Sequence, residues 1–107
     1  MSLPSKVKIG AMTYSVVEVK DLPDYGLCDE EKATILLKAG MPEDVALITL
    51  WHEVMHAALY ALGYRRHNER MVDGLAYQIV LILKDNKELV NAFLHGQDPA
   101  RDGTPAE

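Results

Sequence analysis

The residues whose types and spacing most clearly suggest chemistry are His52-Glu53-Val54-Met55-His56, within a long apolar run. If the run is helical, the two imidazoles lie four positions apart on one face, with β-carbons roughly 5–6 Å apart. Both ring nitrogens can then reach one zinc ion, because Zn–N bonds are about 2.0–2.1 Å long. Glu53 lies beside the same face, where it could take a proton from a water molecule. The pattern therefore predicts metal-assisted hydrolysis.

The segment around this motif is apolar nearly all round from Val45 to Leu62. Its polar residues form one narrow stripe, made of Thr49, His52, Glu53, His56 and Tyr60. A helix of this kind is normally buried, and a buried carboxylate without a partner is costly. A metal ion with its water would supply that partner. The alternative is a surface helix with two histidines on its solvent face, although such a face is normally wider and richer in Lys and Glu.

A hydrolytic zinc site usually has three protein ligands and one open position, so one ligand remains to be found. The candidates downstream are His67, Glu69 and Asp73. The helix would end about 9 Å beyond His56, and a chain that turns at Gly63 can bring this segment back level with the metal.

Glu69 and Asp73 lie four residues apart, on one face of the expected second helix. We favour Glu69 as the third ligand, with Asp73 orienting a ligand imidazole. The reverse assignment stays open, because antiparallel counting puts Asp73 nearer the level of His56. Both acids would also suit a solvated helix N-terminus. His67, beside two arginines, is expected to be an exposed loop histidine, and His95 is expected to take no part.

The elements that must position these residues are predicted to be strands in the N-terminal part of the chain and helices after them. Residues 7–9, 14–19 and 33–38 are rich in β-branched and apolar residues and predict three strands, with a turn at Gly10. Residues 22–31 are acidic and rich in turn formers, which predicts a loop. We therefore expect an α+β fold, in which a small three-stranded sheet packs on the active-site helix and one or two following helices.

The helix boundaries are predicted from capping residues. The first helix should begin near residues 40–44, where Pro and acidic residues favour a helix start, and end at Leu62, before Gly63. The second should run from the N-cap Asn68 to about Lys84, and a short third from Lys87 to about His95. Residues 1–95 would form one domain, and the polar residues 96–107 a disordered tail.

Composition sets further limits on function. A chain of 107 residues with 49% hydrophobic and 25% charged residues is typical of one soluble globular domain. Its net charge of −5 argues against nucleic acid or an anionic membrane as the main partner. Its apolar runs are too short to span a membrane, and residues 1–12 show no signal-peptide core. The single Cys28 cannot form an internal disulfide, so we expect a reducing, cytoplasmic compartment.

The motif His52–His56, followed by Asn68-Glu69 and Asp73, resembles the zincin metallopeptidases, and in particular the gluzincin pattern of thermolysin. The resemblance implies zinc held by His52, His56 and Glu69, with Asp73 as a partner of a ligand. The order of elements is also similar to small H-E-x-x-H proteins of bacteria and phages, including SprT-like domains, whose third ligand is a histidine. The resemblance covers roughly residues 7–90. Two departures are the shorter interval to Glu69 and the lack of a second domain to close a cleft.

The function implied is a zinc-dependent metallopeptidase in which Glu53 is the general base and a peptide or protein is the substrate. Zincins commonly align substrate along an edge strand, which would here be residues 33–38. Tyr60, Tyr64 or Tyr77 could stabilise an oxyanion, although tyrosines more often pack. Two other functions stay open. One is a metal-binding regulatory or interaction module with little hydrolysis, which a phage could encode. The other is a metallohydrolase with another substrate.

Overall fold

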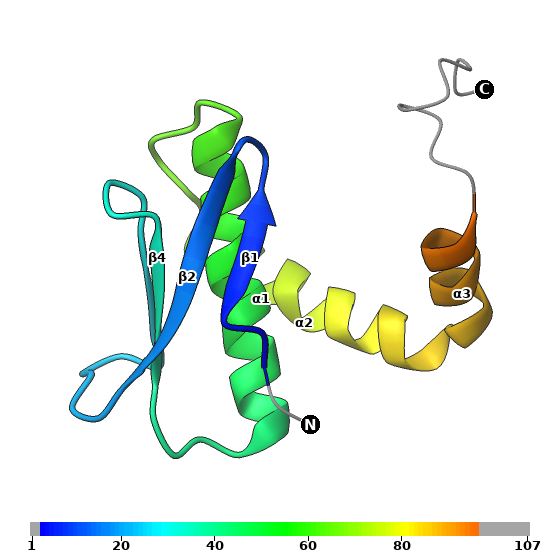
Figure 1. Cartoon of the computed structure of the whole chain (residues 1–107), viewed down its shortest axis with the longest axis horizontal. Coiled ribbons are helices and arrows are strands. Elements are labelled where there is room, and N and C mark those ends of the chain that lie inside the picture. Colours follow the sequence, from blue (N-terminus) through cyan, green and yellow to red (C-terminus); the bar gives the residue numbers. More distant parts are fainter. Residues whose placement is uncertain (1–2, 97–107) are drawn as a thin grey trace.

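The computed structural model describes residues 3–96 and has an α+β fold. A four-stranded mixed sheet at the N-terminus packs on a long helix, and two further helices follow (Figure 1). The elements in chain order are β1 (Lys6–Ile9), β2 (Met12–Val19), β3 (Gly26–Asp29), β4 (Thr34–Lys38), α1 (Glu43–Ala61), α2 (Glu69–Asp85) and α3 (Lys87–His95).

The strands lie in the order β1-β2-β4-β3. β1 and β2 form an antiparallel hairpin, which turns at Gly10 with a φ of 62°. β2 and β4 are parallel, and β3 returns antiparallel to β4. The prediction of three strands was therefore wrong, because β3 lies within residues 22–31, which we expected to be a loop. Only four residues long, β3 depends on its hydrogen bonds to β4 rather than on local sequence preference.

The predicted edge strand at residues 33–38 was also wrong. β4 occupies that segment and has β2 on one side and β3 on the other, so both of its edges are paired. Ile35 and Leu37 on β4 are fully buried, as expected for a central strand. The edge strands of the sheet are therefore β1 and β3, and both contact α1.

The core lies between the sheet and α1. It is made of Ile9, Tyr14, Ile35, Leu37, Leu50 and Ala57, which come from three strands and the helix. Leu50 and Ala57 are seven positions apart and lie on one side of α1. The same helix therefore uses one face for the core and leaves another for the residues of the predicted site.

The helix boundaries confirm the capping predictions. α1 ends at Ala61, and Gly63 follows with a φ of 94°, a left-handed conformation that favours glycine. Asn68 caps α2, because its side chain accepts a hydrogen bond from the backbone N–H of Met71. α3 begins at Lys87 and ends at His95, as predicted. The chain thus turns back sharply after α1, within seven residues.

The sequence also predicts a disordered tail and no membrane-spanning segment. Of the tail expected at residues 96–107, only Gly96 is among the described residues, and the remainder lies outside them. No helix in the described part of the chain is long and apolar enough to cross a membrane.

Replacing Ile35 by Ala should lower the free energy of unfolding by about 2–4 kcal/mol, because the side chain is fully buried in the central strand. Chemical denaturation with far-UV circular dichroism measures this change. Val17→Ala on β2 is the control: its side chain is 44% exposed, so the loss should stay below about 1 kcal/mol. Equal losses for the two variants would contradict this description of the core.

Candidate metal centre

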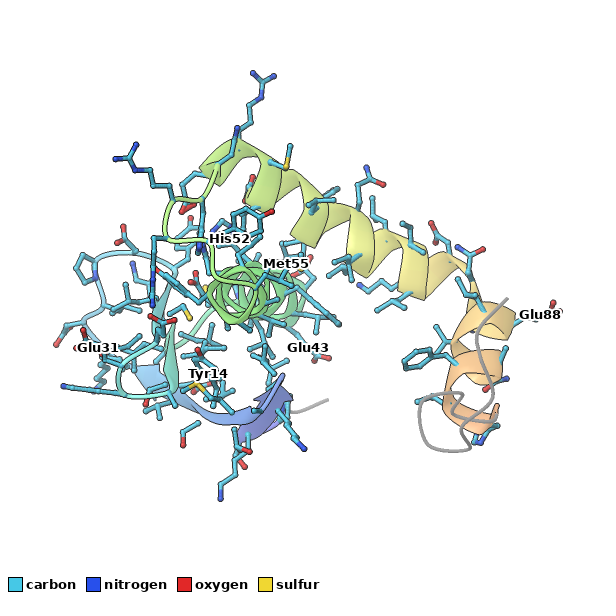
Figure 2. The ribbon with its side chains drawn as sticks, turned by 90° about the horizontal axis from the view of Figure 1, so that it is seen from above. Tyr14, Glu31, Glu43, His52, Met55 and Glu88 are labelled. Atoms are coloured by element: carbon cyan, nitrogen blue, oxygen red, sulfur yellow. The ribbon has the colours of Figure 1, made fainter. Side chains whose placement is uncertain are left out.

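The structure brings His52, His56 and Glu69 together where the start of α2 meets the middle of α1. One ligand atom from each lies within 4.8 Å of the others, so the group could hold a metal ion. The Nε2 atoms of the two histidines are 3.2 Å apart. Oε2 of Glu69 lies 3.1 Å from Nε2 of His56 and 3.6 Å from Nε2 of His52. Figure 2 shows His52 on the side of α1 toward α2, whereas Tyr14 lies on the side of the sheet.

These separations match those of ligands around a zinc ion. Ligands about 2.0–2.1 Å from a tetrahedral centre lie about 3.3 Å from each other. The three observed separations range from 3.1 to 3.6 Å. The side chains therefore need little rearrangement to coordinate one ion.

The proton on His56 is directed away from this centre by His67. Nε2 of His67 lies 2.9 Å from the carbonyl oxygen of Tyr64, which can only accept, so this nitrogen carries a proton. In neutral His67, Nδ1 is then an acceptor, and it lies 2.6 Å from Nδ1 of His56. His56 therefore donates from Nδ1 and keeps a lone pair on Nε2, the atom that faces Glu69.

Asp73 lies beside Nδ1 of His52, just as His67 lies beside Nδ1 of His56. Its Oδ1 lies 3.4 Å from Nδ1 of His52, one helical turn beyond Glu69. A carboxylate at this position favours a proton on Nδ1, which again leaves the lone pair on Nε2. The structure thus places Asp73 behind the imidazole of His52 rather than among the three converging atoms.

The donor set fits a cation for an electrostatic reason. With both imidazole protons on Nδ1, two nitrogen lone pairs and a carboxylate face one another with no proton between them. Such groups repel unless a positive charge lies among them. Neutral imidazole nitrogens with a carboxylate are also ligands that zinc prefers. The arrangement of the surrounding hydrogen bonds therefore supports a metal site.

The three ligand candidates border a groove of about 850 Å³ between α1, α2 and β3. Its walls are formed by Pro23, Asp24, Tyr25, Gly26, Leu27, Cys28, Val45, Ile48, Thr49, His52, Glu53, His56, Tyr60, Glu69, Asp73 and Tyr77. Residues 25–28 line it consecutively, which indicates that the edge of β3, rather than one of its faces, borders the groove. Four carboxylates and no lysine or arginine line it within the described residues.

Glu53 is buried at the floor of this groove, with 6% of its surface exposed. It lies on α1 beside His52, and β3 covers it closely. A Cβ added to Gly26 would meet Oε2 of Glu53 at 3.0 Å and Cγ2 of Thr49 at 2.8 Å. Glycine at position 26 therefore lets the edge strand approach the carboxylate, and a larger residue would have to displace one of the two.

Burial changes the protonation of three groups at the site. It raises the pKa of Glu53 to about 7, assisted by Glu69 and Asp24 and opposed by His52. Burial also lowers the pKa of His56, which keeps its imidazole neutral and able to coordinate. The pKa of Cys28 is raised to about 12, first by burial and then by Glu53. The thiol therefore stays protonated near neutral pH, where it is a poor metal ligand.

The structure brings together Glu53 and all of the ligand candidates that we favoured, but the prediction for His67 was wrong. This residue is half-buried, and its ring stacks on His56 with centroids 4.9 Å apart. The neighbouring arginines predict a solvated loop, yet Arg65 pairs with Glu30 and leaves His67 to pack inward.

Tyr60 and Tyr77 line the groove, whereas Tyr64 contributes a backbone carbonyl. His95 ends α3, outside the groove.

Comparison with known proteins adds no family assignment. No protein-family model, curated protein or solved structure matches the chain. Its interpretation therefore depends on the geometry of the site.

Replacing His67 by Phe should weaken zinc binding by about 10–100-fold, because the ring can still stack while the acceptor for Nδ1–H of His56 is lost. Competition with a chromophoric chelator measures the affinity. His67→Asp, which restores an acceptor, should bind more tightly than His67→Phe. Equal affinities for the wild type and the Phe variant would contradict this role for His67.

Glu53→Gln should stabilise the metal-free protein at pH 8 by about 1–3 kcal/mol. The pKa of Glu53 is about 7 in the folded state against an ordinary 4.5, so the folded state binds the proton more tightly. The wild type therefore loses stability as the pH rises from 4.5 to 7, and the two proteins should be equally stable at pH 4. Urea unfolding in the presence of a chelator tests this, and a wild type as stable as the variant at pH 8 would refute it.

Proposed function

We propose that this protein is a zinc-dependent metallopeptidase. The observation that carries the proposal is the convergence of His52, His56 and Glu69 beside the buried carboxylate of Glu53, at the floor of a groove. The donor set could serve a purely structural ion, but structural sites are normally closed by four protein ligands. Here three ligands face a groove that a substrate can enter.

In this proposal His52, His56 and Glu69 hold the zinc ion, in the arrangement that the gluzincin resemblance implies. A zinc ion bound there would act as a Lewis acid that lowers the pKa of a water molecule toward about 7. Asp73 and His67 hold the two imidazoles with their Nε2 lone pairs toward the ion. Each ligand histidine therefore has a partner of its own, which is typical of zinc sites.

Glu53 is the proposed general base. Its pKa of about 7 in the metal-free protein lies near the value at which a group can both accept and release a proton at neutral pH. It would take the proton of the attacking water and pass it to the nitrogen of the cleaved peptide bond. Nearby positive charge lowers the pKa of a carboxyl, so the base would be largely ionised at neutral pH in the loaded enzyme.

The proposed path for the substrate follows the edge of β3. A peptide could pair with this edge as an additional strand, since the other edge of β3 is used by β4. The four carboxylates of the groove favour substrates with basic or apolar side chains over acidic ones. Tyr77, which lines the groove one turn beyond Asp73, is the proposed hydrogen-bond donor to the oxyanion. Tyr60 is less suited, because its ring packs against His67.

We also propose that the protein works in the cytoplasm. Cys28 is a free thiol, as is usual in a reducing compartment.

The zinc-loaded protein should cleave members of a peptide library, and Glu53→Gln should lower kcat by at least about 100-fold while zinc binding persists. Mass spectrometry of the products measures cleavage, and elemental analysis measures zinc. His52→Ala is the matched control, which should lose both zinc and activity. Equal cleavage by the wild type and Glu53→Gln would remove Glu53 as the base. Stoichiometric zinc without cleavage by either protein would instead indicate a metal-binding regulatory module.

A further inference from the structure

The α2–α3 arm, residues 69–95, projects away from the sheet and α1 (Figures 1 and 2). α2 packs on α1, and its buried residues are Val72, Ala76 and Val80. Beyond Val80 every residue from 81 to 89 is exposed. Three consecutive large apolar residues, Leu81, Ile82 and Leu83, lie in this exposed segment. Within the described part of the chain, nothing covers them.

Three exposed apolar residues of α2 form a row along the helix together with one exposed glutamine. Met71, Leu75, Gln78 and Ile82 follow one another at intervals of four, three and four residues, and all four are exposed. This spacing places them on one face of the helix, turned away from the residues that pack on α1. Alternation of three and four is the pattern by which one helix packs along another. We refer to these four residues, with Gly74, as the α2 seam.

Gly74 gives an independent indication of a partner. It lies in the middle of α2, where glycine weakens a helix. No contact within the chain accounts for it, because an added Cβ would meet no atom within 4 Å and its φ is not positive. A glycine on an exposed helix face allows the backbone of a second helix to come close. The residue is therefore explained if another helix lies across the seam.

The charges at the two ends of the seam indicate that the partner is a second copy. Arg70 stands at the start of α2 and Asp85 at its end, and both are exposed. Antiparallel pairing of two identical helices about Gln78 places Arg70 level with the partner's Asn86, one residue from the partner's Asp85, and the reverse. Parallel pairing would place like charges together instead. The seam is thus complementary to itself when the second helix is reversed, as a two-fold interface requires.

The arm also carries exposed apolar side chains beside the seam. Eight large apolar side chains of the arm, each 37–86% exposed, are Met71, Leu75, Leu81, Ile82, Leu83, Leu89, Phe93 and Leu94. Three of them, Met71, Leu75 and Ile82, belong to the α2 seam, and Leu89, Phe93 and Leu94 lie on α3. A membrane surface suits the arm less well, because its basic residues are balanced by acidic ones: Arg70, Lys84 and Lys87 against Glu69, Asp73, Asp85 and Glu88.

We propose that the protein forms a two-fold symmetric dimer in which the α2 seams of two copies pack antiparallel, with α3 extending the contact at both ends. The partner backbone lies closest at Gly74, and the partner's Ile82 packs against it. This proposal uses none of the metal ligands, so it stands or falls independently of the peptidase proposal.

Sedimentation equilibrium of the full chain over a range of concentrations tests the dimer. We expect a mass twice the 11.9 kDa of one chain, falling toward 11.9 kDa on dilution. Leu75→Glu should give a monomer at all concentrations with an unchanged circular dichroism spectrum. Leu62→Glu is the control: Leu62 is 73% exposed at the end of α1, outside the arm, and this variant should still dimerise. A wild-type monomer throughout, or an assembly that grows without limit, would overturn the proposal.

Charge reversal and Gly74 test the antiparallel register. Arg70→Glu and Asp85→Arg should each weaken the dimer about 5–10-fold, and the double variant should recover most of that loss. Both changes suit the helix dipole, so neither should destabilise the monomer. Gly74→Leu should weaken the dimer at least 10-fold while favouring the helix itself. Absence of recovery in the double variant, or a Gly74→Leu dimer of wild-type affinity, would exclude this register.

Discussion

Two imidazole lone pairs and a carboxylate are held against one another where α2 meets α1, and most features of the site follow from this arrangement. Repulsion among His52, His56 and Glu69 would separate the two helices unless a cation lies between them or protons move. The partners that fix the proton positions come from the turn and the first helical turns beyond α1: His67 for one ring and Asp73 for the other. The segment that follows α1, residues 67–73, therefore carries both the third ligand candidate and the partners of the first two.

Different faces of α1 carry the residues of the core and the residues of the candidate site. Leu50 and Ala57 pack into the core, while the histidines face α2. Glu53 lies between these two environments, under the edge strand, where its burial is costly for the folded protein but raises its pKa into the range useful for proton transfer. Burial of Glu53 thus lowers the stability of the folded protein at one position of a helix that otherwise supplies much of the core.

The parts of this structure that depend on local sequence could be predicted. The helices, their caps at Asn68 and Gly63, and the histidine pair all follow from spacing within one or two turns. The coarse α+β class followed as well. The strand order did not, because β3 is a four-residue strand within a turn-rich segment, and it pairs with β4. The inward packing of His67 could not be predicted for a related reason: Arg65 pairs with Glu30, 35 residues earlier in the chain, and so does not hold this segment in solvent.

All three ligand candidates lie within residues 52–69, whereas Glu53 is covered by β3, from an earlier part of the chain. The group of ligand candidates therefore requires only α1, the turn after it and the start of α2, a unit of low contact order that can form early in folding. The covering of Glu53 requires the whole sheet, including the parallel β2–β4 pair, which closes more slowly. A folding chain could thus bring its three ligand candidates together before the carboxylate of Glu53 reaches its final buried environment.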